Sequence, residues 1–169
     1  MPGGEKDNIS IKKPSFTKKS IHSKEKANII SRFSGLDTIY ITTNDDLKEV
    51  IESLADNTFA FIKAGVYSLK TTIHLSEKSN VVISGEGFNS TIINITANNK
   101  FRRSITIGKN VKSLLIQNIS FKGVGFNSNI YHAAIGSSLG RSTTGVEDIT
   151  IQSIKVEDLP IGISVGVAP

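Results

Sequence analysis

The stretches Ser113-Leu-Leu-Ile-Gln-Asn-Ile-Ser-Phe121 and Asp148-Ile-Thr-Ile-Gln-Ser-Ile-Lys-Val156 repeat one pattern at an offset of 35 residues. They align without a gap and place apolar residues at the same four positions, which in the first copy are Leu114, Ile116, Ile119 and Phe121. The alternation of apolar residues, which sends every second side chain of a strand to one face, slips by one residue at Gln117-Asn118. A bend at this point keeps both short strands turned inward, so each copy predicts part of a coil.

Neighbouring stretches extend the repeat. Asn80-Val-Val-Ile83 is a third, looser copy that lies 33 residues before the first one. A further strand candidate follows each copy, at 105–107, 133–135 and 161–165. Three short strands per irregular period of about 33 to 35 residues predict an all-β solenoid, because one turn cannot bury its inner face until neighbours stack on it.

One helix is expected before these strands. The spacing predicts it over about 44–55, with Thr43 or Asn44 as the N-cap and Asp45 and Asp46 near its positive end. Four apolar residues share one face at helical spacing, namely Leu47, Val50, Ile51 and Leu54. After this helix, from Phe59 onward, short β-branched runs are separated by Gly, Asn, Ser and Lys, which is typical of strands and turns.

Charge divides the chain into a basic segment and a neutral body. Residues 1–36 hold eight basic and three acidic residues and so carry the whole net charge of +5, whereas 37–169 is neutral. The basic segment shows no sustained apolar period, which predicts a flexible tail, either a solvated leader or an electrostatic tether to an anionic polymer or membrane. Nucleic acid is not expected as a partner, because the body has no excess of basic residues.

Composition excludes several classes of protein and site. The 169 residues are enough for one domain, and the absence of cysteine excludes disulfides and thiolate zinc sites. No run approaches the ~18 apolar residues of a membrane span, so none is expected. The first residues have no apolar stretch after their charges and do not form a secretory signal, which leaves the compartment open.

Three stretches after the predicted helix carry a family resemblance: Phe61-Ile-Lys-Ala-Gly-Val-Tyr67, Val82-Ile-Ser-Gly-Glu-Gly-Phe-Asn-Ser-Thr-Ile-Ile93 and Leu115-Ile-Gln-Asn-Ile-Ser-Phe121. Together they resemble the start of right-handed parallel β-helix proteins of the pectin-lyase-like superfamily. The resemblance covers roughly 37–169. It implies a right-handed single-stranded parallel β-helix of about four coils, capped at its N-terminal end by the α-helix. The C-terminal end is expected to be either truncated or covered by a partner.

The resemblance also assigns the corner residues. In this family an Asn at a tight corner stacks on its equivalents in adjacent coils. Asn118 matches that position, Ser153 occupies it one coil later and Gly85 one coil earlier, so the expected side-chain ladder is incomplete.

Known catalytic motifs of the family are missing, including the paired aspartates with Gly-His-Gly of polygalacturonases and the Arg-x-Pro-x-x-Arg of pectate lyases. Whether the chain is an enzyme therefore stays open, with a polysaccharide lyase as the expected type.

Loop positions supply the candidate site residues. His132 and Arg141 are the catalytic candidates, for proton transfer and for an acidic group of the substrate, and the alternatives are a structural histidine and a solvated loop charge. Tyr131, Gln117 and Gln152 are the substrate-binding candidates, and the two glutamines are expected to stack on an outer face one coil apart. Asp158 is the candidate metal ligand, with Ca²⁺ as the ion.

Two functions remain in view. The first is binding or processing of an acidic polysaccharide, as a lyase, an epimerase or a fragment of a phage depolymerase. The second is a structural or adhesive β-helix module without catalysis. The chain stops at what reads as a strand under way, so a second copy or missing C-terminal coils are expected to cover the open end. Proteins of the resembled family are mostly extracellular or associated with virions.

Overall fold

The computed structural model describes residues 33–96, 103–125, 132–137 and 145–164. The chain divides into two compact units, Met1–Ser34 and Gly35–Pro169. All helices and strands discussed below belong to the second unit. Tyr131 and Arg141 lie outside the described residues.

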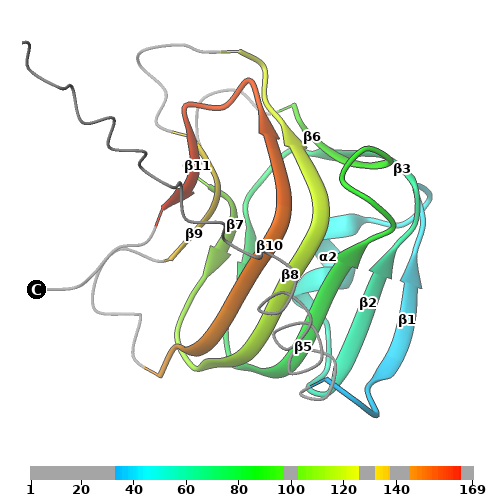
Figure 1. Cartoon of the computed structure of the whole chain (residues 1–169), viewed down its shortest axis with the longest axis vertical. Helices are drawn as coiled ribbons and strands as arrows, with labels where there is room; N and C mark the ends of the chain where they lie inside the picture. Colours follow the sequence, from blue (N-terminus) through cyan, green and yellow to red (C-terminus); the bar gives the residue numbers. More distant parts are fainter. Residues whose placement is uncertain (1–32, 97–102, 126–131, 138–144, 165–169) are drawn as a thin grey trace, which may run out of the picture. The chain divides into compact units, whose positions relative to one another are not determined.

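The repeated stretches stack directly on one another in parallel. Leu114 pairs with Val81 on one side and with Ile149 on the other, so the offsets of 33 and 35 residues are strand registers and the predicted repeat is confirmed. This first stack, whose strands lie side by side in Figure 1, contains five members: β1 (Asp37–Ile41), β2 (Thr58–Ile62), β5 (Lys78–Gly85), the first part of β8 (Val111–Lys122) and the first part of β10 (Glu147–Glu157).

Two further stacks complete the curled unit. In the second stack, β3 (Gly65–Leu69) pairs with β6 (Thr91–Ile95), and β6 pairs with the second part of β8. The third stack is a four-stranded sheet that contains β4 (Ile73–Leu75), β7 (Arg103–Ile107), β9 (Ala133–Ser137) and β11 (Ile161–Ser164). The last three are the strand candidates that follow each copy of the repeat. Every strand pair among the described residues is parallel, which confirms the expected all-β parallel fold.

The predicted bend occurs at Asn118. Its backbone is left-handed (φ 59°), as is that of Ser153 one coil later (φ 51°), and this single residue turns the chain from the first stack into the second. Gly85 lies beneath the same corner, where a Cβ atom would overlap the carbonyl oxygen of Asn118. The side-chain ladder is incomplete at this corner, because Gly85 has no side chain. Asn118 Nδ2 donates instead to Ser84 Oγ, at 3.4 Å.

The helix exists, but it is shorter than predicted and has a different cap. It spans Leu47–Glu52 (α2), and Asp46 is the N-cap, since its Oδ1 accepts a hydrogen bond from the Glu49 N–H at 3.1 Å. The expectation of Thr43 or Asn44 as the cap was wrong. The cause is Asp45, whose carboxylate accepts bonds from the backbone N–H and the hydroxyl of Thr42 and so closes a separate turn before the helix.

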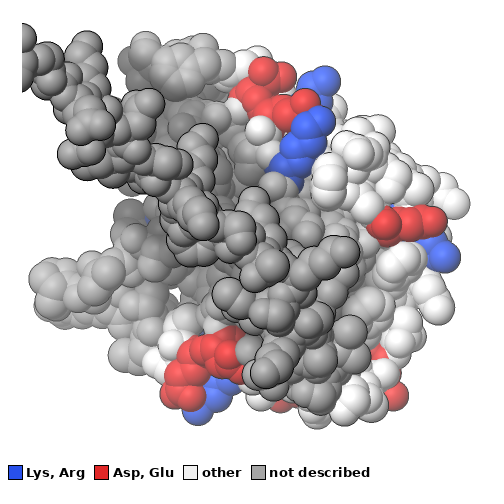
Figure 2. Space-filling view, viewed as in Figure 1, with Lys and Arg blue, Asp and Glu red and all other residues white. Residues whose placement is uncertain are grey.

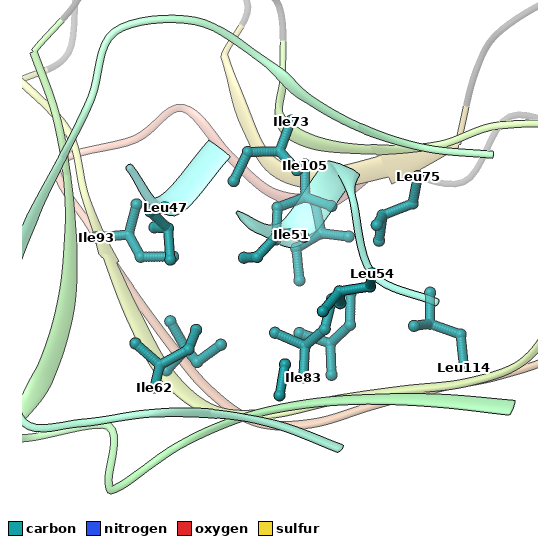
Figure 3. Packing of buried hydrophobic residues seen from close by; sticks show 14 of the residues in the cluster. Leu47, Ile51, Leu54, Ile62, Ile73, Leu75, Ile83, Ile93, Ile105 and Leu114 are labelled. Carbon is teal, nitrogen blue, oxygen red and sulfur yellow. The ribbon is translucent and has the colours of Figure 1, made fainter. Parts of the chain in front are cut away.

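The apolar face of the helical segment enters the core as expected. Leu47, Ile51 and Leu54 are at most 4% exposed, and in Figure 3 they lie among Ile62, Ile73, Leu75, Ile83, Ile93, Ile105 and Leu114 from the surrounding strands. The helix packs on β4 and β3, each of which is the end strand of its sheet among the described residues. The Glu52 carboxylate accepts the backbone N–H of His74 in β4 at 2.7 Å, so the helix also satisfies a strand-edge donor.

Burial decreases toward β10. Phe121 in β8 is completely buried, whereas Val156, which pairs with it one coil later, is only partly buried. Likewise, Leu114 is completely buried and Ile149, its partner in β10, only partly.

None of the helices in the described residues has the length and apolarity that a membrane span needs.

Candidate functional site

One row of side chains crosses the outward face of the first stack. Strand registers place Tyr40 beside Phe61, Phe61 beside Ser84, Ser84 beside Gln117 and Gln117 beside Gln152. Five adjacent strands therefore contribute one residue each, and at ~4.8 Å per strand the row is about 19 Å long. We call it the Tyr40–Gln152 row.

The first end of this row is aromatic and cationic. The rings of Tyr40 and Phe61 meet edge to face with centroids 6.0 Å apart, and Phe59 stacks beside Phe61 at 6.1 Å. The Lys63 ammonium lies 4.9 Å from the Tyr40 centroid and 5.2 Å from that of Phe61. Because Tyr40 is 63% exposed, this end offers solvent an aromatic face and a positive charge together.

The second end of the row is a ladder of amides. Gln152 Nε2 donates to Gln117 Oε1 at 2.7 Å, and Gln117 Nε2 donates to Ser84 Oγ at 3.4 Å. The expected stacking of the two glutamines is therefore present. Each amide keeps hydrogen-bonding capacity beyond these bonds, and both side chains are partly exposed.

A parallel row on the same face is apolar at its centre. Phe59, Val82, Leu115 and Thr150 are in register there. Val82 and Leu115 are 1% and 3% exposed although they point away from the core cluster. Ser84, at the centre of the Tyr40–Gln152 row, is likewise only 3% exposed. The parts of this outward face that a ligand can reach are therefore the two ends of that row, Tyr40 with Phe61 and Gln117 with Gln152.

Charges on the described surface are balanced. Glu77 pairs with Lys109 at 2.8 Å, Lys112 with Glu147 at 3.6 Å, and Lys155 with Glu157 at 2.9 Å. Figure 2 shows acidic and basic side chains next to each other in small groups on the visible face. Within the described residues this face has no broad field of one sign, so a charged ligand would be recognised by individual groups such as Lys63.

His132 and Asp158, the other predicted site residues that the structure describes, do not join the row. His132 immediately precedes β9 in the chain and is buried, at 5% exposure. Its backbone carbonyl accepts a hydrogen bond from the Ile161 N–H. Asp158 is exposed at a left-handed corner (φ 54°), and its carbonyl accepts the Gly125 N–H. No group of three or more His, Asp or Glu residues that could hold a metal ion occurs in the described part of the chain. The roles expected for His132 and Asp158 remain predictions.

Sequence reasoning missed Tyr40, Phe61 and Lys63, as well as strand β1. A signal was present, because Thr38-Ile39-Tyr40-Ile41 is rich in β-branched and aromatic residues and alternates like a strand. The alternation places Tyr40 opposite the buried Ile41, hence on the outward face.

His132 predicts a pH-dependent component of stability. Burial lowers its pKa, so just below its ordinary value near 6.5 the unfolded chain binds a proton that the native state does not. Stability is then fully present above about pH 6.5 and falls as the pH decreases. We expect urea unfolding at pH 7.5, 6.5 and 5.5 to show a smaller pH dependence for His132→Gln than for the wild type. Equal slopes in the two proteins would contradict this.

Comparison with known proteins identified no relative: no family model, no curated protein and no solved structure matches the chain.

Proposed function

We propose that the second unit is a right-handed single-stranded parallel β-helix of the pectin-lyase-like type and that the Tyr40–Gln152 row binds an acidic polysaccharide. Three features support the architecture: three stacks of parallel strands, left-handed corners one coil apart and a helix over the strand edges at one end. Parallel strands joined through a crossover are right-handed in about 98% of cases, which supports the handedness.

The observation that carries the binding function is the combination of groups in the row. Aromatic rings pack against the apolar face of a sugar, and amide groups exchange hydrogen bonds with its hydroxyls. Lys63, over both rings, can attract the carboxylate of a uronate. A chain of sugars lying across the strands would meet the aromatic end first and the amide end up to about 19 Å away, with the buried Ser84 between them.

Binding is better supported than catalysis. The described residues near the row contain no pair of titratable side chains in hydrogen-bond contact that could act as acid and base, and His132 is buried away from this face. Polymer recognition by the row does not require such a pair. The described part of the chain therefore binds the polymer without cleaving it.

The test is binding of the full chain to polygalacturonate and alginate by isothermal titration calorimetry, with dextran as a neutral polymer. We expect Tyr40→Ala to weaken binding at least ~5-fold, because an aromatic anchor of a binding surface contributes more than about 1 kcal/mol. Phe88→Ala is the matched control, since Phe88 is also an exposed aromatic residue (43%) but lies outside the row.

Salt dependence provides a second readout. Lys63→Gln should reduce both the affinity and its sensitivity to ionic strength, because the charge is exposed and screened by salt. Equal affinity of the wild type and Tyr40→Ala, or no binding to either acidic polymer, would refute the proposal. Ultraviolet absorbance of unsaturated uronate products, followed in the same mixtures, would reveal lyase activity and overturn the assignment of a role in binding alone.

A further inference from the structure

A cleft of about 350 Å³ lies between the start of α2 and strand β3. Thr43, Asp45 and Leu47 contribute to its wall on the helix side. The opposite wall is a continuous run of chain from Val66 to Thr71, which comprises most of β3 and the two residues after it. The cleft therefore follows one edge of a strand.

This edge of β3 has no partner strand in the described residues. On its other edge β3 pairs with β6: the Gly65 N–H donates to the Ser90 carbonyl at 2.8 Å, and the Thr96 N–H donates to the Leu69 carbonyl at 3.0 Å. Successive residues of a strand direct their backbone groups to opposite edges. The N–H and C=O groups of Val66, Ser68 and Lys70 therefore face the cleft, along roughly 13 Å of chain.

The helix contacts β3 but forms no hydrogen bond with this edge in the described residues. Glu52 at its last turn accepts the His74 N–H of β4, but no bond of this kind within the described residues reaches Val66, Ser68 or Lys70. Val66 is 60% exposed, and Ser68 and Lys70 are exposed as well. Unpaired strand edges of this kind are the surfaces to which extended peptides add as a further strand.

The two ends of the cleft differ in charge. Asp45 lies near Tyr67, and its hydrogen bonds from Thr42, first from the backbone N–H and then from the hydroxyl, lower its pKa and keep it ionised at neutral pH. Lys48 is engaged by Glu52 on the same helix, so it does not neutralise this end. The far end holds Lys70, for which no ion pair occurs among the described residues.

We propose that the free edge of β3 binds an extended peptide, which adds as a strand in the cleft and places a basic side chain near Asp45 and an acidic group near Lys70. The backbone groups of Val66, Ser68 and Lys70 supply the affinity. An apolar residue of the peptide on the outer face packs against Val66 as a cross-strand pair. With its basic end first, the peptide runs parallel to β3, as every strand pair in the described part of the unit does.

The probe is the fluorescein-labelled, end-blocked peptide Lys-Val-Thr-Val-Thr-Val-Glu, titrated with the full chain and followed by anisotropy. We expect Ser68→Pro to weaken binding at least ~10-fold. It deletes an N–H that faces the cleft, while an edge strand tolerates proline at such a position. Thr96→Ala, an exposed substitution next to the paired edge, is the matched control and should leave binding unchanged.

Charge reversal tests the orientation. Lys70→Glu should weaken binding of the Lys…Glu peptide and strengthen binding of the same peptide with Lys at both ends, because the new carboxylate repels the peptide's Glu and attracts a Lys. Lys70 is exposed, so the substitution lies on the surface. A peptide methylated on alternate backbone nitrogens should not bind when those nitrogens face β3. Indifference to Ser68→Pro or to the terminal charge would refute strand addition.

Hydrogen exchange of the free protein gives an answer that does not depend on the peptide chosen. We expect the Ser68 and Lys70 amides to exchange at least ~100-fold faster than those of Tyr67 and Leu69, which face β6. Equal protection of all four amides would show that the edge is already paired and would overturn the proposal. Failure of the peptide to bind despite fast exchange would refute the peptide chemistry assigned to the cleft.

Discussion

Replacing Gly85 by alanine is expected to lower the free energy of unfolding by about 3 kcal/mol, because the added methyl group has no room at the corner. A Cβ at this position would overlap the carbonyl oxygen of Asn118 and lie 2.9 Å from Thr91 Cβ. The backbone carbonyl cannot move aside, since Asn118 is the left-handed residue that turns the chain between two stacks. The substitution therefore requires one coil to shift against the next.

Gly162→Ala is the matched control for this experiment. Among the described residues, the atom nearest to its Cβ would be Val156 Cγ2, at 3.8 Å. Stability should stay the same or rise by up to ~1 kcal/mol, because alanine restricts the unfolded chain. Urea denaturation followed by circular dichroism measures both variants. Equal stabilities for Gly85→Ala and Gly162→Ala would show that the corner is not packed as described.

Phe121→Ala should produce a loss of similar or larger size, about 3–5 kcal/mol. Phe121 is completely buried, so truncation removes a large apolar side chain and leaves a cavity. Val156→Ala tests the equivalent position one coil later, where the side chain is only partly buried and the expected loss is about 1 kcal/mol. The comparison thus measures how tightly successive coils are packed.

Phe121→Leu provides a folded reference if the alanine variant does not fold. It keeps most of the apolar volume, and the expected loss is about 1 kcal/mol. The order of stability should be wild type, then Phe121→Leu and Val156→Ala, then Phe121→Ala. A Val156→Ala loss as large as that of Phe121→Ala would contradict the decrease in burial toward β10.

The repeat could be recognised in the sequence because equivalent positions of successive copies hold apolar residues, and these residues must all face the same core. Leu114 and Ile149 must both point inward, and a slip by one residue would expose them, so the register could be predicted from spacing alone. The bend at Asn118 followed from the same reasoning. The start of the helix could not be predicted in this way, since the competing hydrogen bonds that Thr42 donates to Asp45 decide where it begins.

The Tyr40–Gln152 row could be predicted only in part. Gln117 and Gln152 lie 35 positions apart in matching copies, so their stacking follows from the repeat. Tyr40, Phe61 and Ser84 are separated by 21 and 23 residues, because the first coils are shorter than the later ones. No single period aligns all five residues, and the aromatic end appears only when the strands are placed in register.

The pattern of strand pairing has a consequence for how the chain folds. Every pairing among the described strands joins residues between 21 and 35 positions apart, so each step of assembly closes a loop of similar length at a similar entropic cost. None of these strand pairings requires parts of the chain that are more than 35 residues apart to meet. Ordering can therefore spread from one coil to its neighbour. Loss of structure should follow the reverse route and begin at β10 and β11, whose inward side chains are the least buried, while the coils around α2 stay ordered longest.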